Sequence, residues 1–238
     1  MNLLMITQAM FMLGFVSMAA ATFYFVLQRG EYKPENRVTV TYAATITFIA
    51  AIMYWQMKDI VGFGSTLQPI VAQIEATMPV RYLDWVLTTP LLLLEFGIIA
   101  AIAGAPKGLT YRLIVADLVM IITGYLGEIG PVGSGGNYVN FVISSIAWLY
   151  IIYLIWNVVP GKASAEVKKA IKNMKLFVIF GWAIYPIGTA VQEFLQLNQA
   201  DAANLELAVC LAAIIYVVAD VVNKVGFGIV ALSALKKK

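Results

Sequence analysis

A lysine and an aspartate lie inside an apolar stretch near the end of the chain. Lys224 follows Asp220 by four residues in ADVVNKVGFG, within the apolar run Cys210–Leu235. A charged side chain at bilayer depth costs roughly 3 kcal/mol or more, so this pair indicates a functional site. A buried lysine loses its proton readily and condenses with aldehydes. Lys224 is therefore a candidate Schiff-base site with Asp220 as its counterion; the alternative is a structural Lys–Asp pair that locks two helices together.

A second set of polar residues occurs in the segment RYLDWVLTTPLLLLE. Asp84, Thr88 and Glu95 are separated by four and seven residues, which places them along one stripe of a helix. Asp84 and Glu95 are eleven residues apart, or about 16 Å along a helix axis. That distance is too long for direct proton transfer, so the spacing predicts a polar track along which protons are carried between two carboxyl groups.

The composition identifies the setting of these residues. Hydrophobic residues make up 61% of the chain and charged residues 12%, against about 25% charged residues in ordinary soluble domains. We therefore expect a polytopic membrane protein. A single cysteine and no histidine argue against disulfides and most transition-metal sites. The net charge of +3 gives no support for nucleic-acid binding.

The apolar segments predict an all-α bundle of seven transmembrane helices that forms a single domain over residues 1–238. The first segment lacks a basic leader region, and we expect it to be a retained helix. Each segment has about 20 apolar residues, enough to cross a bilayer. The expected spans are Leu3–Gln28, Val38–Met57, Val80–Ala103, Leu109–Gly127, Tyr138–Val159, Leu176–Phe194 and Leu205–Leu235.

The connections between the spans are rich in turn-forming residues. The segment VGFGS at residues 61–65 has glycines among apolar residues and predicts a short hairpin outside the membrane, between the second and third helices. Basic residues near span ends stay on the cytoplasmic side. On one side they are Arg29, Lys33, Arg37, Lys107, Arg112, Lys162, Lys168, Lys169, Lys172, Lys175 and Lys236 to Lys238, whereas the opposite loops hold only Lys58. This asymmetry predicts an external N-terminus and a cytoplasmic C-terminus.

In that orientation the two carboxyl groups on the third helix have different environments. Arg81 and Asp84 lie toward the exterior and Glu95 toward the cytoplasm, while Lys224 lies deeper than Asp220. We expect Glu95, among leucines, to rest protonated and Asp84, beside cations, to rest ionised. The pair then predicts one proton acceptor and one proton donor. The alternative for Glu95 is a passive, protonated packing contact.

The chain resembles the microbial (type I) rhodopsins, which are retinal-binding proteins of seven helices, over its whole length. The resemblance rests on RYLDWVLTTPLLLLE, GWAIYP and ADVVNKVGFG in that order and spacing. The triplet Asp84, Thr88 and Glu95 is similar to that of the proteorhodopsin-type outward proton pumps. The resemblance implies all-trans retinal bound as a Schiff base to Lys224, Asp84 as primary acceptor and counterion, Asp220 as second counterion, Arg81 as gate to the release path and Glu95 as cytoplasmic donor.

The same resemblance implies a retinal pocket with aromatic walls. An apolar, aromatic slot suits a polyene, and we expect Tyr54 and Tyr185 to donate their hydroxyls to Asp220. Asp117 matches an acidic position near the ring end of retinal and has an expected structural or tuning role. Taken singly, the pocket residues would more often be core packing. They are Trp85, Thr89, Leu92, Met120, Gly124, Ser144, Ser145, Trp148, Trp182, Tyr185, Tyr54 and Asn223.

Three positions depart from the pattern of the proteorhodopsin-type pumps or the archaeal pumps. Met53 stands where the proteorhodopsin-type pumps carry a histidine that pairs with the acceptor. Thr189 stands where an aromatic residue is expected after the Tyr-Pro pair, and its small size opens one wall of the pocket. The paired release glutamates of archaeal pumps are only half suggested, by Glu193 and Glu206. The release group is therefore unassigned.

Two further positions bear on the pigment. Phe141 occupies the position where carotenoid-binding relatives carry glycine, which argues against a carotenoid antenna. Leu92 stands where leucine accompanies green absorption and glutamine blue absorption. The resemblance thus predicts a green-absorbing pigment without a second chromophore.

These residues predict a light-driven outward proton pump in the cell membrane (plasma or bacterial inner membrane), a transporter rather than an enzyme. We expect the lipid bilayer as its partner, and the family resemblance implies a pentamer or hexamer of the chain with Glu128 and Tyr125 near the contacts. The main alternative is a sensory photoreceptor that signals through a partner, although sensors often lack a carboxyl donor such as Glu95. Asp84 disfavours a chloride pump, and the triplet differs from the Asn-Asp-Gln of sodium pumps. A retinal-free receptor or transporter is the third alternative.

Overall fold

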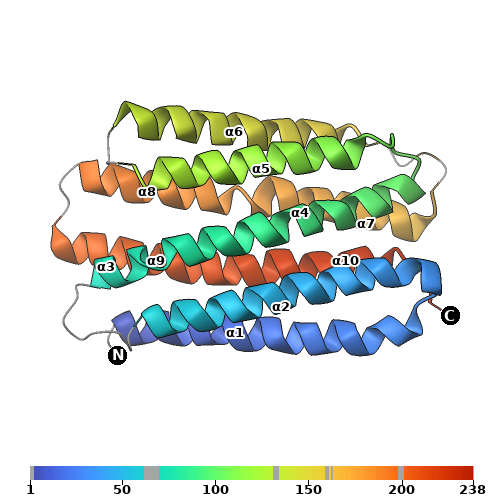
Figure 1. Ribbon diagram of the computed structural model, residues 1–238, viewed down its shortest axis with the longest axis horizontal. Helices are drawn as coiled ribbons and strands as arrows, with labels where there is room; N and C mark the ends of the chain where they lie inside the picture. Colours follow the sequence, from blue (N-terminus) through green and yellow to red (C-terminus); the bar gives the residue numbers. More distant parts are fainter. Residues whose placement is uncertain are drawn as a thin grey trace.

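The computed structural model describes residues 3–61, 70–130, 134–158, 161, 163–197 and 201–237. These residues form an elongated bundle of helices with the N-terminus at one end and the C-terminus at the other (Figure 1). No β-strand occurs among them; an isolated bridge joins Tyr32 to Lys237. The helices are α1 (Leu3–Gln28), α2 (Arg37–Ile60), α3 (Ile70–Glu75), α4 (Met78–Ile102), α5 (Leu109–Glu128), α6 (Gly135–Trp156), α7 (Ala165–Leu176), α8 (Ile184–Leu197), α9 (Ala202–Val221) and α10 (Phe227–Ser233).

The described residues contain seven helical stretches that are long and apolar enough to cross a membrane. This confirms the predicted seven-helix class, and α1 has the predicted bounds, Leu3–Gln28. Many large apolar side chains point outward, including Phe23, Leu27 and Phe180, which are 72%, 76% and 67% exposed. An extensive exposed apolar surface marks contact with a membrane or with another protein. The hairpin predicted at residues 61–65 falls almost wholly within residues 62–69, outside the described residues.

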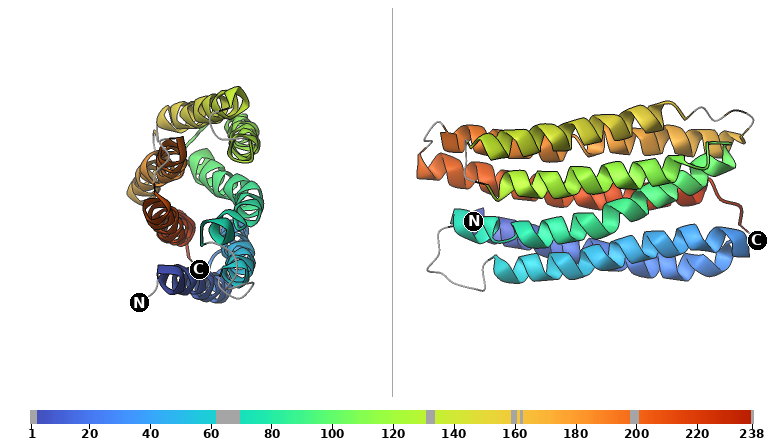
Figure 2. Two further views of the ribbon diagram at one scale, coloured as in Figure 1. Left: turned by 90° about the vertical axis from the view of Figure 1, so that its left-hand side faces the viewer. Right: turned by 45° about the horizontal axis from the view of Figure 1, so that its top comes forward.

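The helices form a ring in chain order. Viewed along the bundle, α1, α2, α4, α5 and α6 lead round to α8 and α9, which returns to α1 (Figure 2). This ring brings α4 and α9, the two helices with membrane-embedded charges, to opposite sides of one interior. Side chains on both helices can therefore meet inside the bundle.

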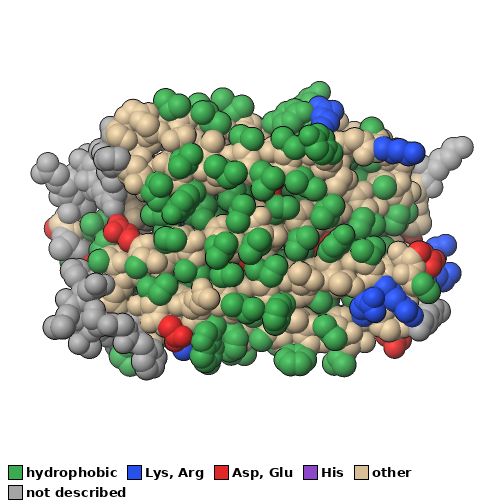
Figure 3. Space-filling view, viewed as in Figure 1, with side chains coloured by type: hydrophobic (Ala, Val, Ile, Leu, Met, Phe, Trp, Pro, Cys, Tyr) green, Lys and Arg blue, Asp and Glu red, His purple; other side chains and the backbone are tan. Residues whose placement is uncertain are grey.

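Basic side chains gather at the end of the bundle that holds the C-terminus, which we call the C-terminal end, opposite the N-terminal end (Figure 3). The predicted boundary of the sixth span is wrong on this side. The helix begins at Ala165 rather than at 176, and Ser164 accepts a hydrogen bond from the backbone N–H of Val167 as its cap. The helix continues beyond its apolar part because α7 is amphipathic: one face packs inward, and lysines lie on the other. The buried residues of α7 are Val167, Ala170, Ile171 and Met174.

Two π-helical turns lie in the middle of the last two spans. One covers Phe177–Gly181 between α7 and α8, and the other covers Val222–Gly226 between α9 and α10. The amide of Asn223 donates a hydrogen bond to the Gly181 carbonyl at 3.1 Å and so joins the two turns. Turns of this type leave carbonyl groups free for other donors and occur often at functional sites. Lys224 lies in the second turn.

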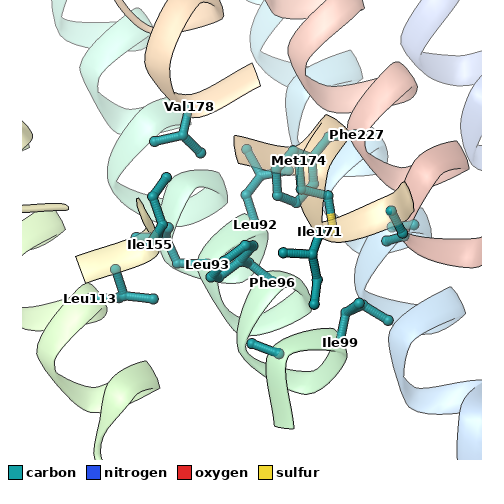
Figure 4. Packing of buried hydrophobic residues seen from close by; sticks show 14 of the residues in the cluster. Leu92, Leu93, Phe96, Ile99, Leu113, Ile155, Ile171, Met174, Val178 and Phe227 are labelled. Atoms are coloured by element: carbon teal, nitrogen blue, oxygen red, sulfur yellow. The ribbon is translucent and has the colours of Figure 1, made fainter. Parts of the chain in front are cut away.

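Apolar packing is dense in the C-terminal half of the bundle. Figure 4 shows side chains from α4, α5, α6, α7 and α10 meeting there. Leu92, Leu93 and Phe96 of α4 are at most 1% exposed and form the centre of this cluster. Interiors packed in this way exclude water. The C-terminal half therefore surrounds any polar group in it with a dry, apolar shell.

Candidate functional site

The centre of the bundle holds a buried cluster of three charged side chains. Nζ of Lys224 lies 2.6 Å from Oδ2 of Asp84 on α4 and 2.9 Å from Oδ2 of Asp220 on α9. None of the three side chains is more than 3% exposed. A buried charge is tolerated only when it is paired and hydrogen-bonded. The structure thus brings together the lysine and both carboxylates that the sequence singled out.

Hydroxyl groups hold the two carboxylates in place. Tyr54 donates to Oδ2 of Asp220 at 2.8 Å, and Tyr185 donates to Oδ1 of the same carboxylate. Thr88 donates to the main-chain carbonyl of Asp84 at 2.8 Å and lies 3.4 Å from its Oδ1. Asp220 therefore has three donors with Lys224 included. Asp84 has fewer, so it is the carboxylate with more capacity to take a proton.

Arg81 lies one helical turn from Asp84, toward the N-terminal end of the bundle. Its Nη2 donates to Oγ1 of Thr77 at 3.2 Å. Its guanidinium lies 5.1 Å from the ring centre of Tyr216 and 6.0 Å from that of Trp85. Cation–π contacts at these distances are attractive. Arg81 thus places a positive charge on the N-terminal side of the ion cluster.

Glu95 occupies the opposite side of the cluster. Its side chain is fully buried, and neither carboxyl oxygen has a hydrogen-bond partner among the described residues. The apolar residues Leu92, Leu93 and Phe96 lie beside it in the sequence and are themselves buried. An isolated ionised carboxylate in such a place is very costly. The environment of Glu95 therefore favours the neutral acid.

Asp117 on α5 is the fourth buried carboxyl group among the described residues. Thr89 of α4 donates to its Oδ2 at 2.8 Å, and the residue is 0% exposed. Thr89 itself lines the central cavity, whereas Asp117 lies behind it. The geometry fits the structural or tuning role that the sequence suggested.

A cavity of about 520 Å³ begins at Lys224 and runs between α4, α5, α6, α8 and α9. Trp85 and Trp182 are large aromatic members of its wall, and Tyr185 and Trp148 add to it. Trp148 is fixed by a hydrogen bond from Nε1 to the Val178 carbonyl at 3.2 Å. The predicted pocket residues that line the cavity are Lys224, Trp85, Thr89, Leu92, Met120, Gly124, Ser144, Ser145, Trp148, Trp182, Tyr185 and Asn223.

The structure differs from the predicted pocket in two respects. Tyr54 does not line the cavity; it lies on the far side of Asp220, beside a small second hollow. Glu128 was not predicted as a pocket residue, yet its carboxylate faces the cavity and accepts a hydrogen bond from Thr189; its expected place near subunit contacts stays a prediction. Thr189, which was expected to open one wall of the pocket, lines the cavity. The remaining lining residues were not predicted as pocket residues: Glu75, Met78, Tyr82, Ile121, Gly127, Ile129, Asn137, Phe141, Pro186, Gln192 and Glu193.

Most of these additional residues extend the cavity toward the N-terminal end of the bundle. The one sequence signal for this extension was Thr189, a small residue where an aromatic one was expected. Glu193 lines the extension, whereas Glu206 does not and lies near Cys210 on α9. The half-suggested pair of release glutamates is thus divided between two parts of the bundle.

Comparison with known proteins gives consistent results over the whole chain. Residues 5–238 match the family model described as bacteriorhodopsin-like protein. The green-light absorbing proteorhodopsin of the gamma-proteobacterium EBAC31A08 is 32% identical over 98% of this chain and 87% of its own length. The blue-light absorbing proteorhodopsin of the gamma-proteobacterium Hot 75m4 is 33% identical over 96% of this chain and 85% of its own length. The crystal structure of Exiguobacterium sibiricum rhodopsin is 40% identical with a TM-score of 0.86, and covers 98% of this chain and 97% of that chain.

Proposed function

The chain belongs to the bacteriorhodopsin-like family, and from that premise we propose that it is a light-driven pump that moves protons out of the cell. Its seven apolar spans and its relatives make it a multi-pass protein of the cell membrane. The proposal assigns the proton path to the charged cluster and to Glu95. The buried contact between Nζ of Lys224 and the Asp84 carboxylate, at 2.6 Å, is the observation that carries it.

The cavity has the properties that retinal requires. Its volume of about 520 Å³ is within the usual range for ligand sites, roughly 300–1,000 Å³. Its walls are mainly apolar and aromatic, and a buried primary amine lies at its edge. Trp85, Trp182 and Tyr185 would hold the polyene, and Lys224 would attach it. When bound, all-trans retinal supplies absorption of visible light and a change of shape that displaces the proton held at the lysine nitrogen.

Asp84 is the proposed proton acceptor. Its Oδ2 is within hydrogen-bond reach of Nζ of Lys224, which is the geometric requirement for direct proton transfer. Protonation of Asp84 removes one negative charge from a buried cluster that holds two carboxylates. Thr88 keeps the Asp84 carboxyl oriented through its hydrogen bonds to the same residue.

Asp220 is the proposed second counterion and remains ionised. The hydroxyls of Tyr54 and Tyr185 both donate to it, and donors to a carboxylate stabilise its charged form. Its negative charge therefore stays beside Lys224 while Asp84 gains and loses a proton. The difference between the two carboxylates in number of donors supports this division of roles.

Glu95 is the proposed donor that returns a proton to Nζ of Lys224. A donor must hold a proton at rest, and the apolar surroundings of Glu95 favour its neutral form. It lies on the C-terminal side of the cluster, whereas Arg81 lies on the N-terminal side. Transfer from Lys224 to Asp84 and from Glu95 to Lys224 therefore moves charge in one direction along α4.

The direction of transport depends on the orientation of the chain. Arg29, Arg37 and Arg112 lie at the C-terminal end of the bundle and Lys58 at the other. Basic residues at span ends favour the cytoplasmic side. The distribution of basic residues supports an orientation with Glu95 toward the cytoplasm and Arg81 toward the exterior, in which protons leave the cell past Arg81.

The test is illumination of retinal-supplied cells in an unbuffered medium. We expect light to acidify the medium, and a protonophore to abolish the change. Alkalinisation of the medium would mean inward transport and would refute the proposed path. A coloured pigment with no pH change and a cycle of seconds would support a sensory photoreceptor instead.

A further inference from the structure

The central cavity does not end at the proposed retinal pocket. It continues toward the N-terminal end of the bundle, past Tyr82 of α4, Glu128 of α5 and Glu193 of α8. We call this part the outer limb of the cavity. It adds polar side chains to a cavity whose deeper walls are aromatic and apolar, so it offers a route for protons and water rather than more surface for a polyene.

Glu128 is held inside the bundle by a hydroxyl group. Oγ1 of Thr189 donates a hydrogen bond to its Oε1, and Tyr82 lines the same part of the cavity. The contact connects α5 to α8. The Glu128 carboxylate is thus within hydrogen-bond reach of a hydroxyl through which a proton can arrive.

The hydroxyl of Thr189 connects Glu128 to the region of Arg81. Oγ1 of Thr189 lies 3.2 Å from the Tyr185 carbonyl, and the hydroxyl of Tyr216 donates to the same carbonyl at 3.1 Å. Arg81 lies 5.1 Å from the centre of the Tyr216 ring. Gly188 permits this packing, because a Cβ at that position would overlap the Tyr216 hydroxyl. Tyr216, the Tyr185 carbonyl and Thr189 therefore lie between Arg81 and Glu128.

On its other side, among the described residues, Arg81 lines a small hollow. The second hollow, beside Tyr54, Arg81 and Asp220, has a volume of only about 10 Å³. A single water molecule needs a cavity of roughly this size or more. Its remaining walls are mostly apolar, with Phe11, Met57 and Val217 among them. Of these two cavities, the wider one beside the Lys224–Asp84–Asp220 cluster is therefore the cavity that passes Glu128.

We propose that Glu128 is the proton-release group of this chain. The inference rests on the proposed pump function. The proton that Asp84 gains is passed through the hydroxyls near Arg81 to the Glu128 carboxylate, which becomes a carboxylic acid; Asp84 returns to its ionised form. Glu128 then gives the proton to water that enters from the outer medium, and its carboxylate is restored.

The test compares Glu128→Gln with Glu193→Gln, a matched control on the same outer limb, in retinal-loaded protein in lipid nanodiscs. Flash excitation is followed by the infrared carbonyl band of protonated Asp84 and by a pH-sensitive dye in the medium. In Glu128→Gln we expect both the loss of the Asp84 proton and the dye signal to slow by about 100-fold, the lower end of what a positioned proton-transfer group contributes. Glu193→Gln should keep the wild-type rate.

A second pair of measurements separates a proton-transfer role from a structural one. Glu128→Asp retains a carboxyl group and should restore most of the rate, while the visible absorption band stays unchanged in both Glu128 variants. If Glu128→Gln yields no pigment, Thr189→Val serves in its place, because it removes one donor at nearly constant volume; it should slow release as well.

The outer limb also predicts access from the outer medium. In a Cys210→Ser background, Glu128→Cys in vesicles of the retinal-loaded protein should react with a membrane-impermeant thiol reagent added on the outer side only. Wild-type release kinetics in Glu128→Gln, equal slowing in Glu193→Gln, or no labelling at position 128 would each overturn the inference. If the wild-type chain itself fails to acidify the medium, the pump proposal fails instead, so the two failures are distinguishable.

Discussion

Replacement of Asp84 by asparagine tests the ion cluster most severely. The variant Asp84→Asn keeps the size of the side chain but removes its charge and its ability to take up a proton. The perturbed contact is the 2.6 Å approach of Oδ2 to Nζ of Lys224. All other contacts of Lys224 in the cluster, including the one to Asp220 at 2.9 Å, remain available.

The distance gives the interaction energy that is lost, and the proton-transfer role gives the expected loss of transport. Two unit charges 4 Å apart interact by about 4 kcal/mol at an effective dielectric constant of 20. Scaling to the 2.6 Å contact gives about 6 kcal/mol before the opposing cost of desolvation. Since a positioned proton-transfer group contributes roughly 10²–10⁴-fold to a rate, transport by Asp84→Asn should fall to about 1% of wild type or less.

The assay is light-induced acidification of an unbuffered cell suspension, normalised to the amount of pigment by its visible absorption. The comparison variant is Thr88→Val, which removes the long 3.4 Å contact to Oδ1 of Asp84 and the hydrogen bond to its carbonyl; because the Asp84 carboxyl itself remains, transport should fall less than in Asp84→Asn. The Asp84→Asn pigment should absorb at longer wavelength, because a negative charge next to the nitrogen is lost. Transport by Asp84→Asn at more than a tenth of the wild-type rate would refute the assignment of Asp84 as acceptor.

The remaining predictions concern the donor, the colour, the outer limb and the attachment point. Glu95→Gln should slow the return of a proton to the Lys224 nitrogen by about 100-fold, seen as a prolonged photocycle in flash spectroscopy; an unchanged recovery would remove Glu95 from the path. Leu92→Gln should move the absorption maximum toward blue, because a polar amide then lines the cavity; no shift would mean that this side chain does not tune the pigment. Thr189→Trp should narrow the outer limb and slow bleaching by hydroxylamine in the dark, and equally fast bleaching would contradict the cavity route. Lys224→Ala should give no covalent pigment after addition of retinal, and a coloured, transporting variant would refute the attachment site.

The sequence was sufficient to predict the parts of the fold that depend on local composition. Lipid requires about 20 apolar residues per crossing, so α1 could be predicted to the residue. The pairing of Lys224 with Asp220 follows from a spacing of one turn, and the presence of Asp84 beside them follows from the high cost of an unpaired charge in the membrane. The length of the helices and the pairing of the buried charges both follow from the lipid around the chain. That lipid environment can be inferred from the hydrophobic composition.

Other features depend on packing and could not be predicted in this way. The helix that begins at Ala165 extends past its apolar segment, because an amphipathic first part packs against neighbouring helices, and a search for apolar runs does not detect it. The two π-helical turns have no local sequence signal that we used. Tyr54 was assigned to the pocket from its hydroxyl alone, although its ring lies behind Asp220. The outer limb requires α4, α5, α6 and α8 to be placed together, so Glu128 could not be assigned to it from the sequence.

Time-resolved infrared spectroscopy on the retinal-loaded protein tests the central claim most directly, since it follows individual carboxyl groups during one cycle. The bands are assigned by their absence from Asp84→Asn and Glu95→Gln. The proposed path predicts that a carbonyl band of protonated Asp84 rises as the Lys224 nitrogen loses its proton, and that the band of protonated Glu95 falls only afterwards, as that nitrogen regains one. A Glu95 signal that precedes the Asp84 signal, or a cycle in which Asp84 is never protonated, would contradict the account.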